Sequence, residues 1–217
     1  MFLFYSNSFA HIDHYTSYNK IEYELFRNNK LIGSHNFDFV RSGDKLTVNS
    51  IVKFKITKLG IDLYKYEAKS QENYKNDTFL SFSSKTNQNK KQKYVNIDLN
   101  ESLGNLTVDG SSFKGDASKD FIVGTWWNHE IIKAKAQISA ISGRIIQQKV
   151  TFVGKEKIKI SGKDYEALHF NFSSADENLP PEKKLNTDIW YDAKSNLWLK
   201  AAFDKTGYWE YRIKFYN

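Results

Sequence analysis

The seven residues Gly124-Thr-Trp-Trp-Asn-His-Glu130 contain the strongest candidate for a binding site. Two adjacent tryptophans, Trp126 and Trp127, can supply apolar walls, and Asn128 or His129 can anchor a polar group between them. The same residues also suit a structural role, in which one tryptophan plugs the end of a barrel and the other covers the edge of a sheet. The spacing does not separate these alternatives, so we treat the four residues as ligand-binding candidates.

Two aspartates resemble the carboxylate pair of a glycosidase. Asp188 and Asp192 lie four residues apart, which would place them on the same side of a strand, and sugar hydrolysis needs two carboxylates across the bond. The run Asp192-Ala-Lys-Ser-Asn196, however, is typical of a turn in which an aspartate caps the backbone. The structural interpretation is favoured, so hydrolysis of a sugar or ester is the least favoured function.

Other reactive groups are scarce or wrongly spaced. The chain has no cysteine, which excludes disulfides, thiolate catalysis and cysteine-bound zinc. Nucleophile elbows, phosphate loops and dinucleotide-binding fingerprints do not occur. None of the five histidines has the spacing of a metal site: His11, His14, His35, His129 and His169. We therefore expect no catalytic residue, no metal and no cofactor.

The elements that must position these residues are β-strands. Apolar and polar residues alternate over 21–25, 46–56, 95–99, 197–203 and 209–215. Successive side chains of a strand point to opposite faces, so this pattern predicts sheets with one apolar and one polar face. The expected fold is all-β and mainly antiparallel.

About a dozen strands are expected, in a meander of hairpins joined by asparagine- and glycine-rich turns. The predicted strands are 20–27, 31–40, 45–57, 61–71, 78–84, 93–99, 106–108, 145–154, 156–161, 165–173, 187–191, 197–203 and 209–215. One short helix is expected near 118–136, with Asn128 as N-cap and Glu130 in its first turn. The strands could form a half-open or closed barrel around the helix, or two packed sheets. Residues 11–217 form one domain in this interpretation.

The formal net charge of +7 is spread along the chain. Its tightest cluster, Lys90, Lys91 and Lys93, lies in a polar stretch and is best explained as a solvated face. Arginine is scarce and no nucleic-acid-binding module is present, so we expect no nucleic-acid partner. No stretch after the N-terminus approaches the roughly 18 apolar residues that a membrane-spanning helix requires.

The N-terminus suggests export. Residues 1–10 are an apolar run ending in Ser8-Phe9-Ala10, with small residues where a signal peptidase cleaves, although a positive n-region is missing. We interpret them as the remnant of a secretory signal peptide, the alternative being an apolar first strand or a frayed end. The expected location is periplasmic or secreted.

Several short phrases, in order along the chain, resemble an uncharacterised family of exported bacterial β-proteins, a domain of unknown function found mainly in Gram-negative lineages. These are Gly43–Ser50, Glu72–Leu80, Thr86-Asn87, Trp127-Asn128, Gly143-Arg144, Gly154–Glu156 and Asp188–Ala193 with Trp198 and Phe203. The Trp190-Tyr-Asp192 phrase is the most specific.

The chain departs from this family where glycine is usual, at Asp77 and Lys90, and at Ser139, where an acidic residue is expected. The last departure weighs against an acidic site there. The resemblance implies export and a β fold, but it brings no activity. In character the family is similar to the open β-barrels that carry lipoproteins or lipids across the periplasm, which is an analogy of fold only.

Our first hypothesis is a non-enzymatic periplasmic protein that binds an apolar or amphipathic ligand, such as a lipid, in a half-open barrel lined by Trp126 and Trp127. It predicts an aromatic-lined pocket of drug-sized volume. The alternative is a structural or protein-interaction module of the cell envelope, with a packed core and a functional edge or patch. The residues do not specify the ligand, the envelope partner or the oligomeric state.

Overall fold

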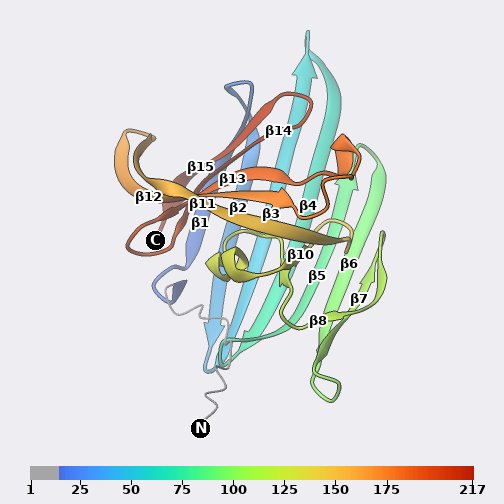
Figure 1. Ribbon diagram of the computed structural model, residues 1–217. Coiled ribbons are helices and arrows are strands. Elements are labelled where there is room, and N and C mark those ends of the chain that lie inside the picture. Colours follow the sequence, from blue (N-terminus) through green and yellow to red (C-terminus); the bar gives the residue numbers. More distant parts are fainter. Residues whose placement is uncertain (1–14) are drawn as a thin grey trace.

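Fifteen β-strands hydrogen-bond side by side into one sheet in the computed structural model, which describes residues 15–217 (Figure 1). The first eight are β1 (Lys20–Arg27), β2 (Lys30–Ser42), β3 (Lys45–Lys58), β4 (Ile61–Lys75), β5 (Thr78–Gln88), β6 (Lys91–Asn100), β7 (Asn105–Gly110) and β8 (Lys114–Ser118). The other seven are β9 (Ile122–Val123), β10 (Ala136–Ile138), β11 (Ile145–Ile160), β12 (Lys163–Ser174), β13 (Asn186–Asp192), β14 (Trp198–Asp204) and β15 (Tyr208–Tyr216).

The order of strands in the sheet explains its shape. It runs from β8 through β1, continues with β15 and ends at β9, and every neighbouring pair is antiparallel except β9 with β10. The strands β11–β13 cross over the long strands β2–β5, so the sheet forms two layers of one curled surface (Figure 1). The predicted all-β, mainly antiparallel meander is confirmed, and the barrel is half-open rather than closed.

The two edges of the sheet, β8 and β9, are consecutive in the sequence and contribute to one buried cluster, but they do not hydrogen-bond to each other as neighbouring strands. Phe82, Val108 and Ala117 from one half pack in the same buried cluster as Val123 and Ile138 from the other. Next to this cluster the backbones touch, since the Ser112 amide donates to the Ser142 carbonyl at 2.8 Å. Gly110 permits the contact, because a Cβ there would lie 2.6 Å from the Ser142 oxygen.

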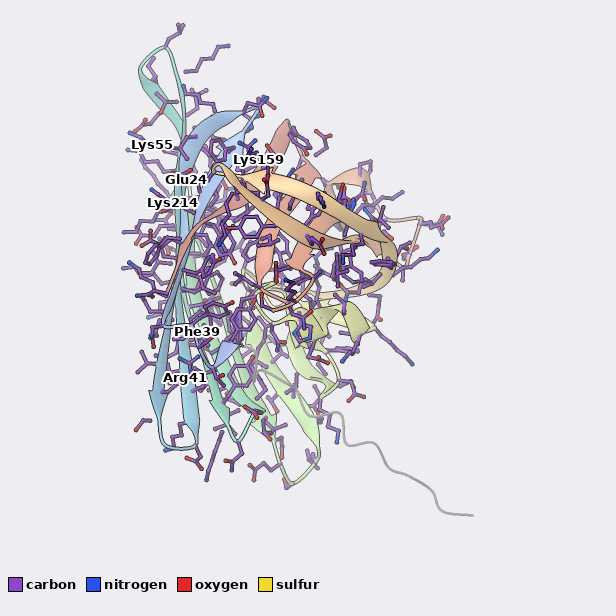
Figure 2. All side chains as sticks on the ribbon, turned by 90° about the vertical axis from the view of Figure 1, so that its left-hand side faces the viewer. Glu24, Phe39, Arg41, Lys55, Lys159 and Lys214 are labelled. Carbon is purple, nitrogen blue, oxygen red and sulfur yellow. The ribbon has the colours of Figure 1, made fainter. Side chains whose placement is uncertain are left out.

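The larger core fills the space between the two layers, where side chains are dense (Figure 2). Its largest fully buried members are aromatic and come from both layers: Tyr15, Tyr23, Phe37, Trp127, Phe172, Tyr191 and Trp198. Each such ring buries on the order of 150–250 Å² and contacts its neighbours edge-on or stacked. Tyr23 stacks on Trp198 with ring centroids 4.1 Å apart, which joins β1 to β14.

The break in the alternating pattern contains less helix than expected. The 3₁₀ helix η2 (His129–Lys133) begins after Asn128, whose side chain accepts a hydrogen bond from the Glu130 amide, as predicted. The short strands β8, β9 and β10 in and beside this region were missed, and the predicted strands 145–154 and 156–161 are one strand, β11, with a bulge between Phe152 and Gly154. A second 3₁₀ helix, η3 (Pro181–Lys183), lies in the predicted loop 174–186. The signal-peptide remnant predicted at 1–10, with His11 and His14, lies outside the described residues.

Several hairpin turns use two residues with positive φ. Asn76 and Asp77 have φ of 46° and 60°, and Asn89 and Lys90 have φ of 50° and 74°. Such pairs match the right-handed twist of the flanking strands. Glycine adopts this conformation without steric cost, so positions 77 and 90 would accommodate it more easily than a larger residue.

We expect Lys90→Gly to raise the free energy of unfolding by about 1 kcal/mol, because it removes a side chain from the left-handed region. Urea unfolding measures the effect. The control is Lys91→Gly, which should lower stability because Lys91 begins β6. Equal changes in the two variants would contradict the explanation.

Candidate functional site

A cavity of about 390 Å³ lies between the two layers of the curled sheet. Its aromatic wall consists of Tyr66, Trp126, Phe203 and Tyr211, and its floor carries small or polar side chains: His35, Ser50, Ala68, Ser70 and Ser84. Pro181, Lys184 and Lys205 border it from the loops that follow β12 and β14. The cavity therefore exists because short inward-facing residues on β3–β5 leave space opposite Trp126, Phe203 and Tyr211.

Trp126 is held in this wall in an unfavourable backbone conformation. Its φ is 64°, a region that bulky residues rarely occupy. The Tyr191 hydroxyl donates to the Trp126 carbonyl at 2.9 Å, and the indole ring lies edge-on to Trp198 at 5.5 Å and to Tyr211 at 5.6 Å. The indole Nε1 is buried and has no hydrogen-bond partner among the described residues. Strain of this kind concentrates at ligand-binding sites.

His35 supplies a second unsatisfied polar atom. Its Nε2 lies 2.8 Å from the Ser50 hydroxyl, while Nδ1 is buried and has no partner in residues 15–217. Burial lowers the pKa of His35 to about 3, so the imidazole is neutral at physiological pH. His35 and Trp126 both line the cavity, and their unpartnered nitrogens are covered by neighbouring atoms. A ligand can therefore hydrogen-bond to them only if these side chains turn towards the cavity.

The other three candidates from the motif do not line the cavity. Trp127 is fully buried in the larger core, and its Nε1 donates to the Glu72 carboxyl at 3.1 Å. Asn128 caps η2, and His129 Nε2 lies 3.2 Å from the Glu130 carboxyl. The structure thus places Trp126 in the cavity wall and its three neighbours behind that wall; ligand binding by the four stays a prediction.

Glu72 on β4 fixes the loop that carries Trp126. Its Oε1 accepts hydrogen bonds from the Thr125 hydroxyl at 2.8 Å and from Trp127, and its Oε2 accepts one from the Tyr74 hydroxyl at 2.8 Å. The residues before and after Trp126 are therefore tied to the same carboxyl group. Burial raises the pKa of Glu72, although the three hydrogen bonds act to lower it.

The sequence pattern gave no signal for Glu72, which lies in a polar stretch of β4. His35 could have been found, because it alternates with Phe37 and Phe39, and these three side chains share the buried face of β2. The cavity residues Tyr66 and Tyr211 follow the same rule, but alternation alone does not show that they border an empty space.

Both members of the carboxylate pair have structural hydrogen-bond partners. Asp192 caps its turn, accepting bonds from the Ser195 amide and hydroxyl, both at 2.8 Å, as predicted. Asp188 accepts bonds from His169 and Asn171. In residues 15–217 no group of three or more histidine and carboxylate side chains could hold a metal ion.

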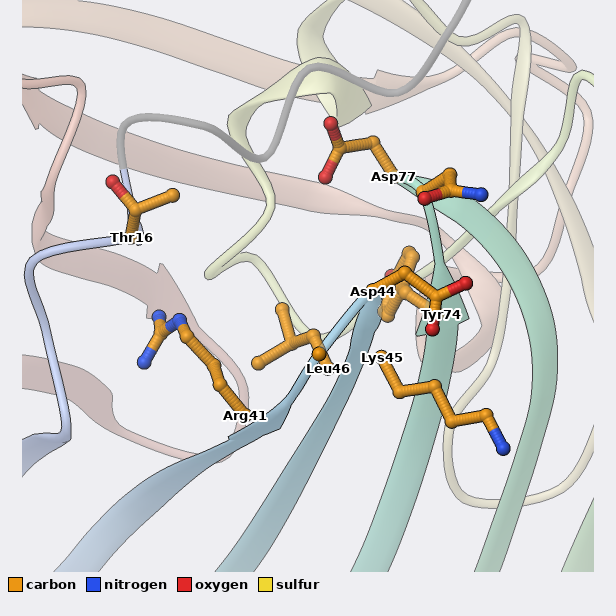
Figure 3. Close-up of a pocket in the computed structure, with 9 residues that line it drawn as sticks. Thr16, Arg41, Asp44, Lys45, Leu46, Tyr74 and Asp77 are labelled. Atoms are coloured by element: carbon orange, nitrogen blue, oxygen red, sulfur yellow. The ribbon is translucent and has the colours of Figure 1, made fainter.

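A smaller hollow of about 230 Å³ lies at the turns β2–β3 and β4–β5 (Figure 3). Arg41, Leu46 and Tyr74 line it, together with Asp44 and Lys45. The Arg41 guanidinium donates to the backbone carbonyls of Tyr15 and Tyr18, so this side chain fastens the N-terminal residues to β2. The hollow is a weaker candidate, because its principal charged group already has structural partners.

Comparison with known proteins identifies the family. The model of a domain of unknown function, DUF6134, matches residues 23–214. The chain belongs to the DUF6134 family. This confirms the resemblance to an uncharacterised family of β-proteins, and no curated protein matches the chain.

A solved structure shows the same fold as this DUF6134 chain. It is the "beta-barrel-like protein of domain of unknown function DUF1849" from Brucella abortus, with a TM-score of 0.62 and 14% identity over 92% of this chain and 97% of that one. A DUF1329 family protein from Desulfovibrio piger is 12% identical over 94% of this chain and 88% of its own. Its TM-score of 0.20 is too low to indicate a shared fold. Among the described residues, no helix has the length and apolar character needed to cross a bilayer.

The buried Glu72 predicts a pH-dependent effect on stability. A carboxyl whose pKa is higher in the folded than in the unfolded protein binds its proton more tightly when folded, so stability falls as pH rises through that interval. Glu72→Gln removes this titration and keeps a side chain of the same shape. We expect the thermal unfolding temperature of the variant to be higher than that of the parent at about pH 7.5. This difference should shrink as the pH falls towards about pH 4.

The matched control is Glu67→Gln on the same strand. Hydrogen bonds from Lys53 and Lys69 lower the pKa of the exposed Glu67, so this variant should lose a small stabilisation at neutral pH. A pH-independent difference for Glu72→Gln would contradict the assigned environment.

Proposed function

We propose that this protein is a non-enzymatic carrier that binds an amphipathic, lipid-like ligand in the cavity of its half-open barrel. The observation that carries the proposal is the pair of buried, unpartnered polar atoms, His35 Nδ1 and Trp126 Nε1, in one aromatic-walled space. Burying a polar group without a partner costs on the order of 1–3 kcal/mol. A bound ligand that draws the two side chains towards the cavity and hydrogen-bonds to these atoms would recover that cost.

The size and lining of the cavity support a small amphiphile. Its volume of about 390 Å³ falls within the range of small-molecule sites, roughly 300–1,000 Å³. Tyr66, Trp126 and Tyr211 provide an apolar wall. Three basic residues, Arg144, Lys184 and Lys205, outnumber the one acid, Asp204, so the border of the cavity is positively charged. The ligand class that fits this arrangement has an apolar body and an anionic headgroup, such as a carboxylate or a phosphate.

The alternative, an envelope interaction module, predicts a filled interior. The observation that favours it is a pair of exposed apolar residues, Phe152 (56% exposed) and Val153 (55% exposed), at the bulge of β11. The cavity and its unsatisfied polar atoms favour the carrier. Asp188 and Asp192 are each held by structural hydrogen bonds, which favours a structural role for both over a hydrolase.

A fluorescent fatty acid tests the carrier function. We expect dansylaminoundecanoic acid to bind saturably and palmitate to displace it. Trp126→Ala should weaken binding about tenfold, since it removes the central wall residue. Ala68→Phe should also weaken it, because it fills the cavity without removing any polar group.

The matched control is Trp190→Ala, because Trp190 stacks on His169 and does not line the cavity. Circular dichroism establishes that each variant is folded. A parent protein that binds no probe, or binding unchanged in both Trp126→Ala and Ala68→Phe, would overturn the proposal.

We also propose that the protein acts after export, in the periplasm or outside the cell; the apolar run that ends at Ala10 supports this. Expression of the full precursor in a Gram-negative host should give a mature chain that begins near His11, in the periplasmic fraction. Mass spectrometry of that fraction measures the cleavage. An uncleaved chain confined to the cytosol would contradict export.

A further inference from the structure

The tip of the β3–β4 hairpin, defined here as residues 57–63, has an unusual composition. Leu59 is 93% exposed, Ile61 66% and Leu63 54%. The turn residues Leu59 and Gly60 both have positive φ, 50° and 79°. At such turns asparagine, aspartate and glycine are favoured, and this chain uses asparagine at the first position of the β1–β2, β4–β5 and β5–β6 turns. A leucine at this position is strained and also exposed to water.

Lysines surround the apolar tip. Lys53, Lys55 and Lys58 come from β3, Lys65 comes from β4, and Lys90 from the next turn borders the hollow beneath the hairpin. Asp62 forms ion pairs with Lys55 and Lys65, and Glu67 pairs with Lys53. The five lysines outnumber these two acids, so the surface around the tip is positively charged; we call these five lysines the lysine collar. Lysine side chains can also lay their aliphatic stems along an apolar surface while their charges stay in water.

The hairpin lies at the same end of the molecule as the mouth of the cavity. In a meander alternate turns share an end, and the β1–β2 turn contacts the β14–β15 turn through the Asn28 amide and the Tyr208 carbonyl, 2.8 Å apart. Tyr66 lines both the hollow beneath the hairpin and the cavity. The hairpin projects beyond its neighbours at the top of Figure 1, and Lys55 lies on it in Figure 2.

We propose that the β3–β4 hairpin tip docks this protein on the surface of an anionic lipid bilayer. Apolar side chains that enter the interfacial region and lysines that face anionic headgroups are the two contributions that hold peripheral proteins on membranes. A protein partner fits this surface less well, because lysine is depleted from protein–protein interfaces. The inference rests on exposed residues alone and goes beyond the carrier function, so either proposal can fail without the other.

Sedimentation of the full chain with vesicles tests the docking. One set of vesicles contains phosphatidylcholine alone, and the other contains an equimolar mixture with phosphatidylglycerol. The protein should bind the anionic vesicles, and high salt should weaken binding. The double variant Leu59→Ser/Ile61→Ser should bind about tenfold more weakly, and Lys58→Gln about fivefold more weakly.

The matched control is Leu103→Ser. Leu103 is 68% exposed in the β6–β7 turn, at the other end of the meander and without a lysine collar, so its substitution should leave vesicle binding unchanged. Thermal unfolding shows whether the tip variants are folded. If the parent protein binds the dansyl fatty acid, the tip variants should bind it equally well. Failure of the parent to bind anionic vesicles would overturn the proposal, as would equal binding by the tip variant and Leu103→Ser.

Discussion

A sheet without large helices can bury its apolar face only against itself, and this constraint shapes the whole molecule. The 3₁₀ helices η2 and η3 have five and three residues, which is too few to cover fifteen strands. The sheet therefore curls until its two ends approach each other near Gly110, and its facing layers bury their apolar side chains in two clusters between them. The segment between β9 and β10 closes the interior, with Trp127 at its centre.

The cavity is a local exception to this self-burial. Where the inward-facing residues are Ser50, Ala68, Ser70 and Ser84, the layers do not fill the space between them. The wall opposite is rigid, because Glu72 ties Thr125 and Trp127 to β4 and leaves Trp126 strained between them. An interior that keeps polar atoms such as His35 Nδ1 unsatisfied is less stable than a packed one, and function is the usual reason for keeping such a feature.

The fold was largely predictable because one physical signal repeats along it. Alternation, together with the turn residues between strands, located twelve of the fifteen strands, since half-buried strands alternate. The strands β8, β9 and β10 were missed because they have five, two and three residues, too few to establish a period. The site was predictable only as a region. Trp126 and Trp127 are neighbours in the chain, and their different places depend on Glu72 and Tyr191, which lie 55 and 65 positions away from their respective partners.

The pairing of β1 with β15 has a consequence for how the chain reaches its fold. This pair joins the half formed by β1–β8 to the half formed by β9–β15, and residues 19 and 20 contact Asn217 through backbone hydrogen bonds. The contact spans nearly the whole chain, which makes it among the costliest in loop entropy and slow to form. During synthesis β1 cannot pair with β15 until the nine residues of β15 have left the ribosome. Until then β1 is an open edge that can pair with any other strand within reach, so β1 is the segment that a chaperone has most reason to cover.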